Sequence, residues 1–210
     1  MTTNLIFIRH AQSTWNEAGR WQGQADPPLS ENGLKQARML AHRLTGWSIA
    51  HLYTSDLERA KMTAAVIGKT LNLSPVIDPV WRERNIGVFE GLTGEEIQQR
   101  FPEVWNNLHT GSISGIAGAE STDSILNRAK MGCQTLLTHH PDETVVVVSH
   151  GGMIQAILVH LLELAPEGFS RLVGGGHTAI SQVTIHAGHA RLVRLNDAAH
   201  LELMSDRFAS

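Results

Sequence analysis

The chain has 210 residues, of which 42% are hydrophobic and 18% charged, enough apolar material for one globular domain with a sizeable core. Its formal net charge of −3, without a cluster of Lys or Arg, argues against nucleic acid or an anionic membrane as the main partner. The single cysteine, Cys133, excludes an internal disulfide and fits a reducing compartment.

The sequence lacks the usual features of export or membrane insertion. No charged segment followed by a long apolar stretch appears near the N-terminus, which argues against a signal peptide. The longest apolar run, 153–162, is interrupted by Gln155 and His160 and is too short to span a bilayer. We therefore expect a cytoplasmic protein.

Strands and helices alternate in the first part of the chain. Residues 5–8 are apolar and rich in β-branched and aromatic side chains, which predicts a buried strand. Ser30 is the expected N-cap of a helix, because apolar residues from Leu34 to Leu44 repeat at intervals of three and four. The other elements expected here are a strand at 50–53, a helix from a cap at Ser55 or Asp56 to about Thr70, and a strand at 75–77.

Residues 84–118 differ in character from the rest of the chain. They are rich in glycine and contain one short expected helix near residues 95–101, with Phe101 assigned to the core. We interpret this stretch as a lid-like excursion over the sheet edge and not as a second domain.

Alternation resumes after the excursion. The expected elements are a helix at 121–137, a strand at 144–148, a helix at 152–164, and strands at 179–185 and 190–195 that form a hairpin. The strand at 144–148 is apolar, as in a parallel sheet covered on both faces. The predicted fold class is α/β, with a mostly parallel central sheet, helices on both faces and the excursion at about 84–118, in one domain spanning 1–210.

Two of the apolar strands end in a histidine. Arg9-His10 follows the strand at 5–8, and His150-Gly151 follows the strand at 144–148 and begins a helix. Ligands of parallel α/β sheets bind outside the carboxyl ends of the strands, and the N–H groups of a helix N-terminus favour an anion. Two histidines and an arginine at such positions suggest phosphate chemistry.

Three other patterns do not support a site. Residues 174–179 match the dinucleotide pattern G-x-G-x-x-A, but they precede a strand instead of following one. Val147 occupies the first glycine position of a nucleophile elbow, so Ser149 is not expected to be a hydrolase nucleophile. The histidines show no H-E-x-x-H spacing or Cys/His cluster, so no metal is expected, and His139-His140 is interpreted as a surface pair.

A series of short elements, taken in order, resembles the histidine phosphatase superfamily, also called the phosphoglycerate mutase-like family. The elements are Arg9-His10-Ala11-Gln12-Ser13-Thr14-Trp15-Asn16, Gln22-Gly23, Ser55-Asp56-Leu57-Glu58-Arg59-Ala60, Glu83 with Gly87-Val88-Phe89-Glu90-Gly91, Gly118-Ala119-Glu120-Ser121 and Ser149-His150-Gly151-Gly152. The matches run from about residue 5 to 201. Ala11 and Phe89 replace the usual Gly and Trp, and His177 stands where relatives often carry Asn.

The resemblance implies a mechanism through phosphohistidine. His10 is the implied nucleophile, and Glu83 is the implied general acid and then base. The residues implied to bind the phosphate are Arg9, Arg59, His150, Asn16, Gln22, Gly23 and Gly151. The arginines would match the phosphate charge, so neither a metal nor another cofactor is implied. Without the resemblance, Glu83 between Arg82 and Arg84 would suit a surface ion pair better.

The expected function is a phosphatase that acts on a small-molecule phosphate monoester, as a monomer or homodimer. A cofactor-dependent phosphoglycerate mutase is the first alternative, but it needs a more basic pocket, and the excursion offers only Arg84 and Arg100. A non-catalytic phospho-ligand binding module is the second. His200-Leu201 resembles the ending of the phosphatase branch, and His200 is expected at the substrate's entrance. The role of His177 stays open.

Overall fold

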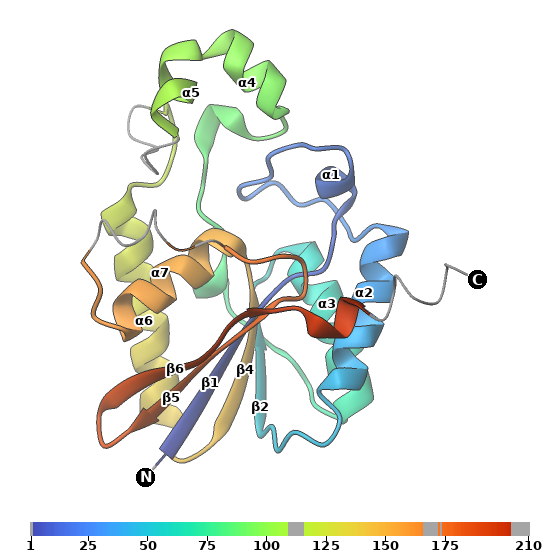
Figure 1. The fold of residues 1–210 in the computed structure, drawn as a ribbon, viewed down its shortest axis with the longest axis vertical. Coiled ribbons are helices and arrows are strands. Elements are labelled where there is room, and N and C mark those ends of the chain that lie inside the picture. Colours follow the sequence, from blue (N-terminus) through green and yellow to red (C-terminus); the bar gives the residue numbers. More distant parts are fainter. Residues whose placement is uncertain (1, 109–115, 166–171, 173, 203–210) are drawn as a thin grey trace.

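The computed structural model describes residues 2–108, 116–165, 172 and 174–202. Within them, six strands form one sheet in the order β3-β2-β4-β1-β5-β6 (Figure 1). The strands are β1 (Thr2–Arg9), β2 (His51–Thr54), β3 (Val76–Ile77), β4 (Thr144–Ser149), β5 (Ile180–His186) and β6 (His189–Asp197). The first four in the sheet order run parallel, and β5 and β6 add an antiparallel hairpin beside β1. The predicted α/β class with a mostly parallel sheet is confirmed.

Helices connect the strands along the chain. They are α1 (Thr14–Glu17), α2 (Glu31–Arg43), α3 (Glu58–Leu71), α4 (Gly94–Arg100), α5 (Pro102–Leu108), α6 (Thr122–His139) and α7 (Gly151–Leu161), with 3₁₀ turns η1 (Pro79–Trp81), η2 (Gly87–Phe89) and η4 (Ala199–Leu201). Four of the helices, α2, α3, α6 and α7, pack against the sheet. No helix in the described ranges has both the length and the apolar character needed to cross a bilayer.

Alternate residues of the central strands face two separate cores. Val145 and Val147 of β4 pack with residues of α6 and α7, whereas Val146 and Val148 pack with residues of α2 and α3. Successive strand residues point to opposite faces of a sheet, so an unbroken valine run suits a strand that is covered on both faces. Figure 1 shows the two helix pairs on opposite sides of the sheet.

Of the two helix caps predicted from the sequence, one is confirmed and one is wrong. Ser30 caps α2 by accepting a hydrogen bond from Gly33 N at 3.0 Å, as predicted. The expected cap of α3 by Ser55 or Asp56 is wrong, because the helix begins at Glu58 and Leu57 makes no side-chain cap bond. The first amide of α3, that of Glu58, instead donates to the carboxylate of Asp26 from the loop after β1.

The excursion carries α4 and α5 beyond the carboxyl ends of the parallel strands (Figure 1). It has a small core of its own around Phe89, Ile97 and Ile116, against which Phe101 and Trp21 pack. The Trp21 and Phe89 rings meet edge to face with centroids 6.1 Å apart. Because Trp21 comes from the loop after β1, the excursion and that loop pack together above the sheet.

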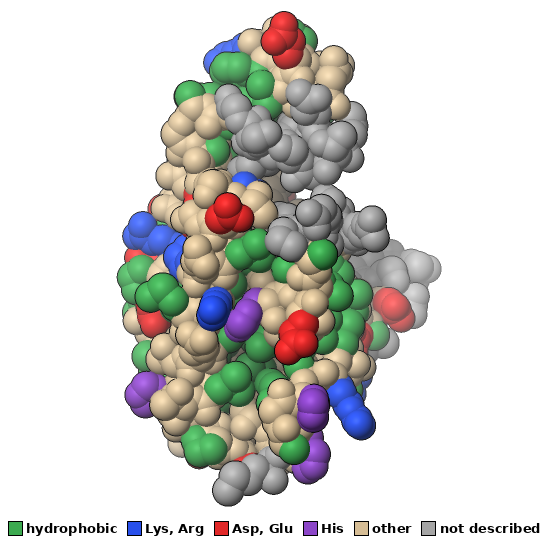
Figure 2. All heavy atoms as spheres, turned by 90° about the vertical axis from the view of Figure 1, so that its left-hand side faces the viewer, with side chains coloured by type: hydrophobic (Ala, Val, Ile, Leu, Met, Phe, Trp, Pro, Cys, Tyr) green, Lys and Arg blue, Asp and Glu red, His purple; other side chains and the backbone are tan. Residues whose placement is uncertain are grey.

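Figure 2 shows one face of the molecule. On this face the described Lys and Arg side chains are scattered among apolar and polar ones.

Candidate active site

The neighbouring strands β1 and β4 bring the two strand-end histidines together. Arg9 is paired with Ser149 in the register of the two strands, and His10 N donates to the Ser149 carbonyl at 2.9 Å. The next residue on each strand is therefore a histidine at the same edge of the sheet. The ring centroids of His10 and His150 lie 5.1 Å apart.

Hydrogen bonds fix the tautomer of His10. Its Nδ1 lies 2.7 Å from the carbonyl oxygen of Ala11, which can only accept, so Nδ1 carries the proton. Its Nε2 lies 3.2 Å from Nε of Arg59, which can only donate, so Nε2 presents a lone pair. Burial, with help from the positive charges of Arg59 and Arg9, holds the pKa of His10 well below its ordinary value. The ring is thus a neutral imidazole whose unprotonated Nε2 accepts from Arg59 and is the candidate nucleophile.

Arg59 is anchored by the backbone of the loop after β1. It stands in the first turn of α3, is 1% exposed, and donates to the carbonyls of Ala25 at 2.7 Å and Gly23 at 2.8 Å. Burial lowers its pKa to about 10, so the guanidinium keeps its positive charge near neutral pH. Gly23 has a φ of +51°, and a Cβ there would lie 2.4 Å from Oε1 of Glu90. Glycine therefore suits this position, where the loop backbone is left-handed and lies close to the Glu90 side chain.

Unpartnered polar atoms gather around His10. Arg9 donates through Nη1 to the Gly175 carbonyl, but its buried Nε has no partner among the described residues. Within the same ranges, neither ring nitrogen of the fully buried His150 has a partner, nor does Nε2 of His177, whose ring centroid lies 6.3 Å from that of His10. Buried polar atoms normally form hydrogen bonds, so a group of them around a lone-pair nitrogen suits an anion with several oxygen atoms.

Glu83, from the loop after η1, directs its carboxylate at the start of α7, next to His150. Its Oε2 accepts from Gly152 N at 3.1 Å, and its Oε1 accepts from Arg84 N at 2.7 Å. A Cβ at position 152 would lie 2.5 Å from Oε1 of Glu83, so glycine at the start of α7 allows the carboxylate to approach. The charge of Glu83 also acts to raise the pKa of Arg9 and Arg59, against the larger lowering effect of their burial.

The two arginines beside Glu83 are bound elsewhere. Arg82 makes a bidentate ion pair with Asp56, with N–O distances of 2.8 and 2.7 Å. Arg84 donates to the Glu120 carbonyl at 2.9 Å and to the Thr122 hydroxyl at 3.1 Å. The sequence-based alternative of an ion pair within Arg-Glu-Arg is therefore not what the described side chains form.

Arg128 supports the Glu83 loop and was missed by the sequence analysis. It extends from α6, pairs with Glu120 at 2.8 Å, and donates to the carbonyls of Val80 at 2.9 Å, Arg82 at 2.6 Å and Glu83 at 3.3 Å. An arginine in a predicted helix gives no sign of carbonyl partners more than 40 residues away, so no sequence signal identified it.

The two predicted amide side chains lie in the loop after β1. Oδ1 of Asn16 accepts from the backbone and hydroxyl of Ser13, both at 3.1 Å, and Oε1 of Gln22 accepts from the same hydroxyl at 2.7 Å. Their oxygen atoms are thus engaged within the loop. Any contact between these residues and a phosphate is expected to come from their amide N–H groups.

His200 is buried against other protein groups. It is 6% exposed, with Nε2 2.9 Å from the Thr178 hydroxyl and Nδ1 3.3 Å from Nη1 of Arg43. Thr178 N in turn donates to the Arg9 carbonyl at 3.0 Å. This differs from the expectation that His200 reaches the substrate, because both ring nitrogens face protein groups; His200 supports the turn that carries His177.

Acidification is expected to destabilise the folded protein. Burial keeps His10 and His150 neutral with strongly lowered pKa values, and it lowers the pKa of His200 to about 4. Between about pH 6.5 and these lower values the unfolded chain binds protons that the folded chain does not. The free energy of unfolding is therefore highest above about pH 7, where these histidines are neutral in both states, and it decreases as the pH falls, by up to about 1.4 kcal/mol per pH unit for each fully buried histidine.

Urea unfolding at pH 7, 6 and 5 and constant ionic strength measures this effect. We expect His200→Gln to flatten the dependence and the exposed His139→Gln to leave it unchanged. A free energy of unfolding that stays level from pH 7 to 5 would show that these imidazoles are not held neutral.

Comparisons with known proteins show the family of the chain. The family model of the histidine phosphatase superfamily, branch 1, matches residues 5–198. The chain is 36% identical over 170 residues to the metal-independent phosphoserine phosphatase of Arabidopsis thaliana, covering 79% of this chain and 71% of the relative. It is 34% identical over 200 residues to phosphoserine phosphatase 1 of Hydrogenobacter thermophilus, covering 94% and 93%.

The relatives also include proteins named for a different reaction. A probable phosphoglycerate mutase of Yersinia pestis is 34% identical over 175 residues, covering 80% of this chain and 79% of the relative. Among solved structures, that of mycobacterial glucosyl-3-phosphoglycerate phosphatase in complex with VO3 has a TM-score of 0.86 and 31% identity, and the alignment covers 92% of this chain and 98% of the other.

Proposed function

Because the chain belongs to the histidine phosphatase superfamily, we propose that it is a metal-independent phosphatase that hydrolyses small phosphate monoesters through a phosphohistidine on His10. The observation that carries the proposal is the fixed state of His10. Its Nδ1–H donates a hydrogen bond to a backbone carbonyl, and its Nε2 lone pair faces Arg59. Buried polar atoms that have no partner among the described residues surround the ring. We propose that the protein acts in the cytoplasm, as a monomer or homodimer.

The first step transfers the phosphoryl group to His10. Nε2 attacks phosphorus and the bond from phosphorus to the ester oxygen breaks. Arg9 and Arg59 match the charge of the phosphate, and His150 donates to its oxygen atoms through an N–H that has no partner among the described residues. Glu83, in its acid form, gives a proton to the leaving oxygen, so that the alcohol leaves neutral.

The second step returns His10 to its starting state. Glu83, now a carboxylate, takes a proton from water as the water oxygen attacks phosphorus. The bond between phosphorus and Nε2 breaks and inorganic phosphate forms. Because Nδ1 of His10 keeps its proton and its carbonyl partner in both steps, the ring can return to the same tautomer without rearrangement.

Two observations favour hydrolysis over a mutase reaction, which passes the phosphoryl group between two hydroxyls of a sugar acid. A mutase needs cations for a second phosphate and a carboxylate. Of the two candidates in the excursion, the Arg84 guanidinium is held by Glu120 and Thr122, and Arg100 is exposed on α4. Neither is directed at the group around His10 by the contacts described.

Product analysis tests the proposal. We expect the purified chain to release inorganic phosphate from O-phosphoserine or another small monoester in a panel with 3-phosphoglycerate and sugar phosphates, and to keep its rate in EDTA. O-phosphoserine is the first choice because two of the relatives are named phosphoserine phosphatases. Isomerisation of 3-phosphoglycerate that is primed by 2,3-bisphosphoglycerate and outpaces phosphate release would favour the mutase. Binding of phosphate esters without turnover of any would favour a binding module.

A further inference from the structure

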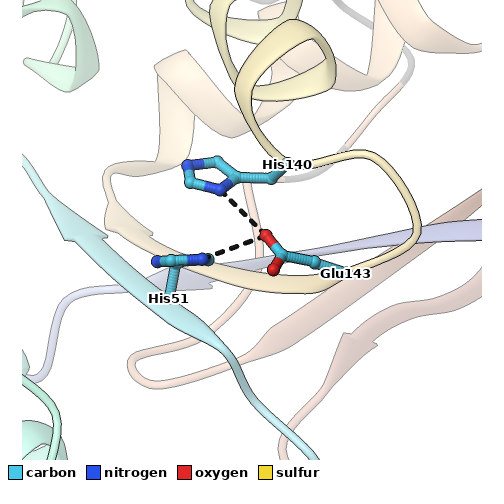
Figure 3. A group of neighbouring side chains, drawn as sticks. All are labelled: His51, His140 and Glu143. Atoms are coloured by element: carbon cyan, nitrogen blue, oxygen red, sulfur yellow. Dashed lines mark hydrogen bonds and ion pairs between the residues drawn. The ribbon is translucent and has the colours of Figure 1, made fainter.

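A second group of histidines lies at the opposite end of the sheet from the pocket. His51 is the first residue of β2, His140 follows the last residue of α6, and Glu143 precedes β4 (Figure 3). The six residues of β4 place its two ends about 16 Å apart, and His150 follows the far end. The group of His51, His140 and Glu143 is therefore well separated from the proposed catalytic residues.

The three side chains converge on one point. Oε2 of Glu143 lies 3.0 Å from Nε2 of His51 and 3.0 Å from Nδ1 of His140, and the three atoms lie within 4.8 Å of one another. Figure 3 shows both rings directing a nitrogen at the carboxylate. Ligand atoms about 2.0–2.1 Å from a tetrahedral zinc ion lie roughly 3.3 Å apart. The nitrogen–oxygen distances therefore need to widen by only a few tenths of an ångström to admit an ion.

The surrounding structure holds these residues in place. Nε2 of His140 lies 2.8 Å from the Tyr53 hydroxyl, so a metal on Nδ1 would leave an N–H on Nε2 to donate to that hydroxyl. The Glu143 carbonyl accepts from Asn4 N at 2.9 Å, and His51 is paired with Val145 in the sheet. His139 is exposed as expected from the sequence, but His140 is buried, so the interpretation of both as a surface pair is wrong. The reason is that Tyr53 and His51 of β2 cover the His140 ring.

We propose that His51, His140 and Glu143 bind a divalent transition-metal ion, and that Zn²⁺ is the ion that the site fits best. Two imidazole nitrogens and one carboxylate oxygen are a usual donor set for Zn²⁺, whereas Mg²⁺ and Ca²⁺ take oxygen ligands. The side chains of His51 and Glu143 are 39% and 40% exposed, which leaves room for water as a fourth ligand. The ion would join β2, the end of α6 and the start of β4.

The proposed metal ion would stabilise the fold and would take no part in phosphate chemistry. A metal bound to the folded chain and not to the unfolded one raises the unfolding temperature with metal concentration. Turnover is expected to be the same with the site filled or empty, because no proposed catalytic residue belongs to it. The two proposals can therefore fail independently.

Titration of the full chain with ZnCl2 tests the site. After EDTA treatment and dialysis, calorimetry on the chain without a histidine tag is expected to give one ion per chain and a raised unfolding temperature. We expect His51→Gln and Glu143→Gln each to weaken binding by at least about tenfold and to remove the thermal shift. His139→Gln is the matched control, because it removes the adjacent exposed histidine, and it is expected to bind as the unchanged chain does.

A second set of variants separates this site from the pocket histidines. His10→Ala disturbs the group of His10, His150 and His177 and is expected to keep the one-to-one binding and the thermal shift. Saturable binding that survives both His51→Gln and Glu143→Gln would overturn the proposal. Absence of saturable binding by the folded chain, checked by circular dichroism, would do the same, as would loss of binding in His10→Ala alone.

Discussion

Replacing His10 with alanine is expected to remove nearly all phosphatase activity, with kcat/KM falling by about 10⁴ to 10⁶-fold, the range seen when a covalent nucleophile is removed. Among the described residues, His10 is the histidine with one ring nitrogen bonded to a backbone carbonyl and the other facing Arg59. Each ring nitrogen of His150 lacks a fixed partner that would select its tautomer, whereas His10 is locked by Ala11 and Arg59. The other residues of the site are proposed to bind the phosphate and not to attack it.

The measurement is phosphate release by the His10→Ala variant, together with trapping of the intermediate. Rapid quenching with a ³²P-labelled ester is expected to leave label on the chain that withstands alkali and is lost in acid, as a phosphoramidate is. The variant should carry no such label. His42→Ala, at an exposed histidine on α2, is the control for the loss of an imidazole. Activity within tenfold of the original in a folded His10→Ala chain would reject the nucleophile.

Replacing Glu83 with glutamine is expected to lower kcat/KM by about 10² to 10⁴-fold on an alkyl ester such as O-phosphoserine. The loss should be much smaller on p-nitrophenyl phosphate, because the nitrophenolate leaves readily without a proton. With that ester the second step becomes slow, since water lacks its base. Label should therefore accumulate on His10 in this variant.

Glutamine keeps one of the two hydrogen bonds that hold Glu83 in place. Its amide oxygen can accept from Gly152 N or from Arg84 N, but its NH2 group cannot accept from the other, so the comparison between the two esters is what separates proton transfer from positioning. Glu95→Gln, at an exposed carboxylate on α4, is the matched control and should behave as the unchanged chain. Equal losses on both esters would mean that Glu83 acts only by holding the start of α7.

The sequence places the two strand-end histidines at the same edge of the sheet. Two apolar runs predict parallel strands, and parallel strands end at one edge, where His10 and His150 are therefore expected. Their closeness, with ring centroids 5.1 Å apart, depends on β1 and β4 being neighbours, which the structure supplies. Their assignment to nucleophile and phosphate donor came from the resemblance and stays a prediction.

The residues that the sequence did not reveal act through contacts between distant segments. Arg128 binds backbone carbonyls of the Glu83 loop, and backbone carbonyls leave no trace in a pattern of side chains. His177 approaches His10 because Thr178 is bound to the Arg9 carbonyl. His140 becomes buried because β2 lies beside it. Each of these needs the strand order, which periodicity does not supply.

The valine run of β4 makes the placement of His10 beside His150 depend on the same strand register as the packing of the two cores. If β4 slipped by one residue along β1, the valines facing α6 and α7 would turn towards α2 and α3, and both cores would be mispacked. The same slip would break the pairing of Arg9 with Ser149 that sets His10 beside His150. A chain with the wrong register would thus lose its stability along with its active site, so a stable but catalytically misassembled population is not expected to accumulate.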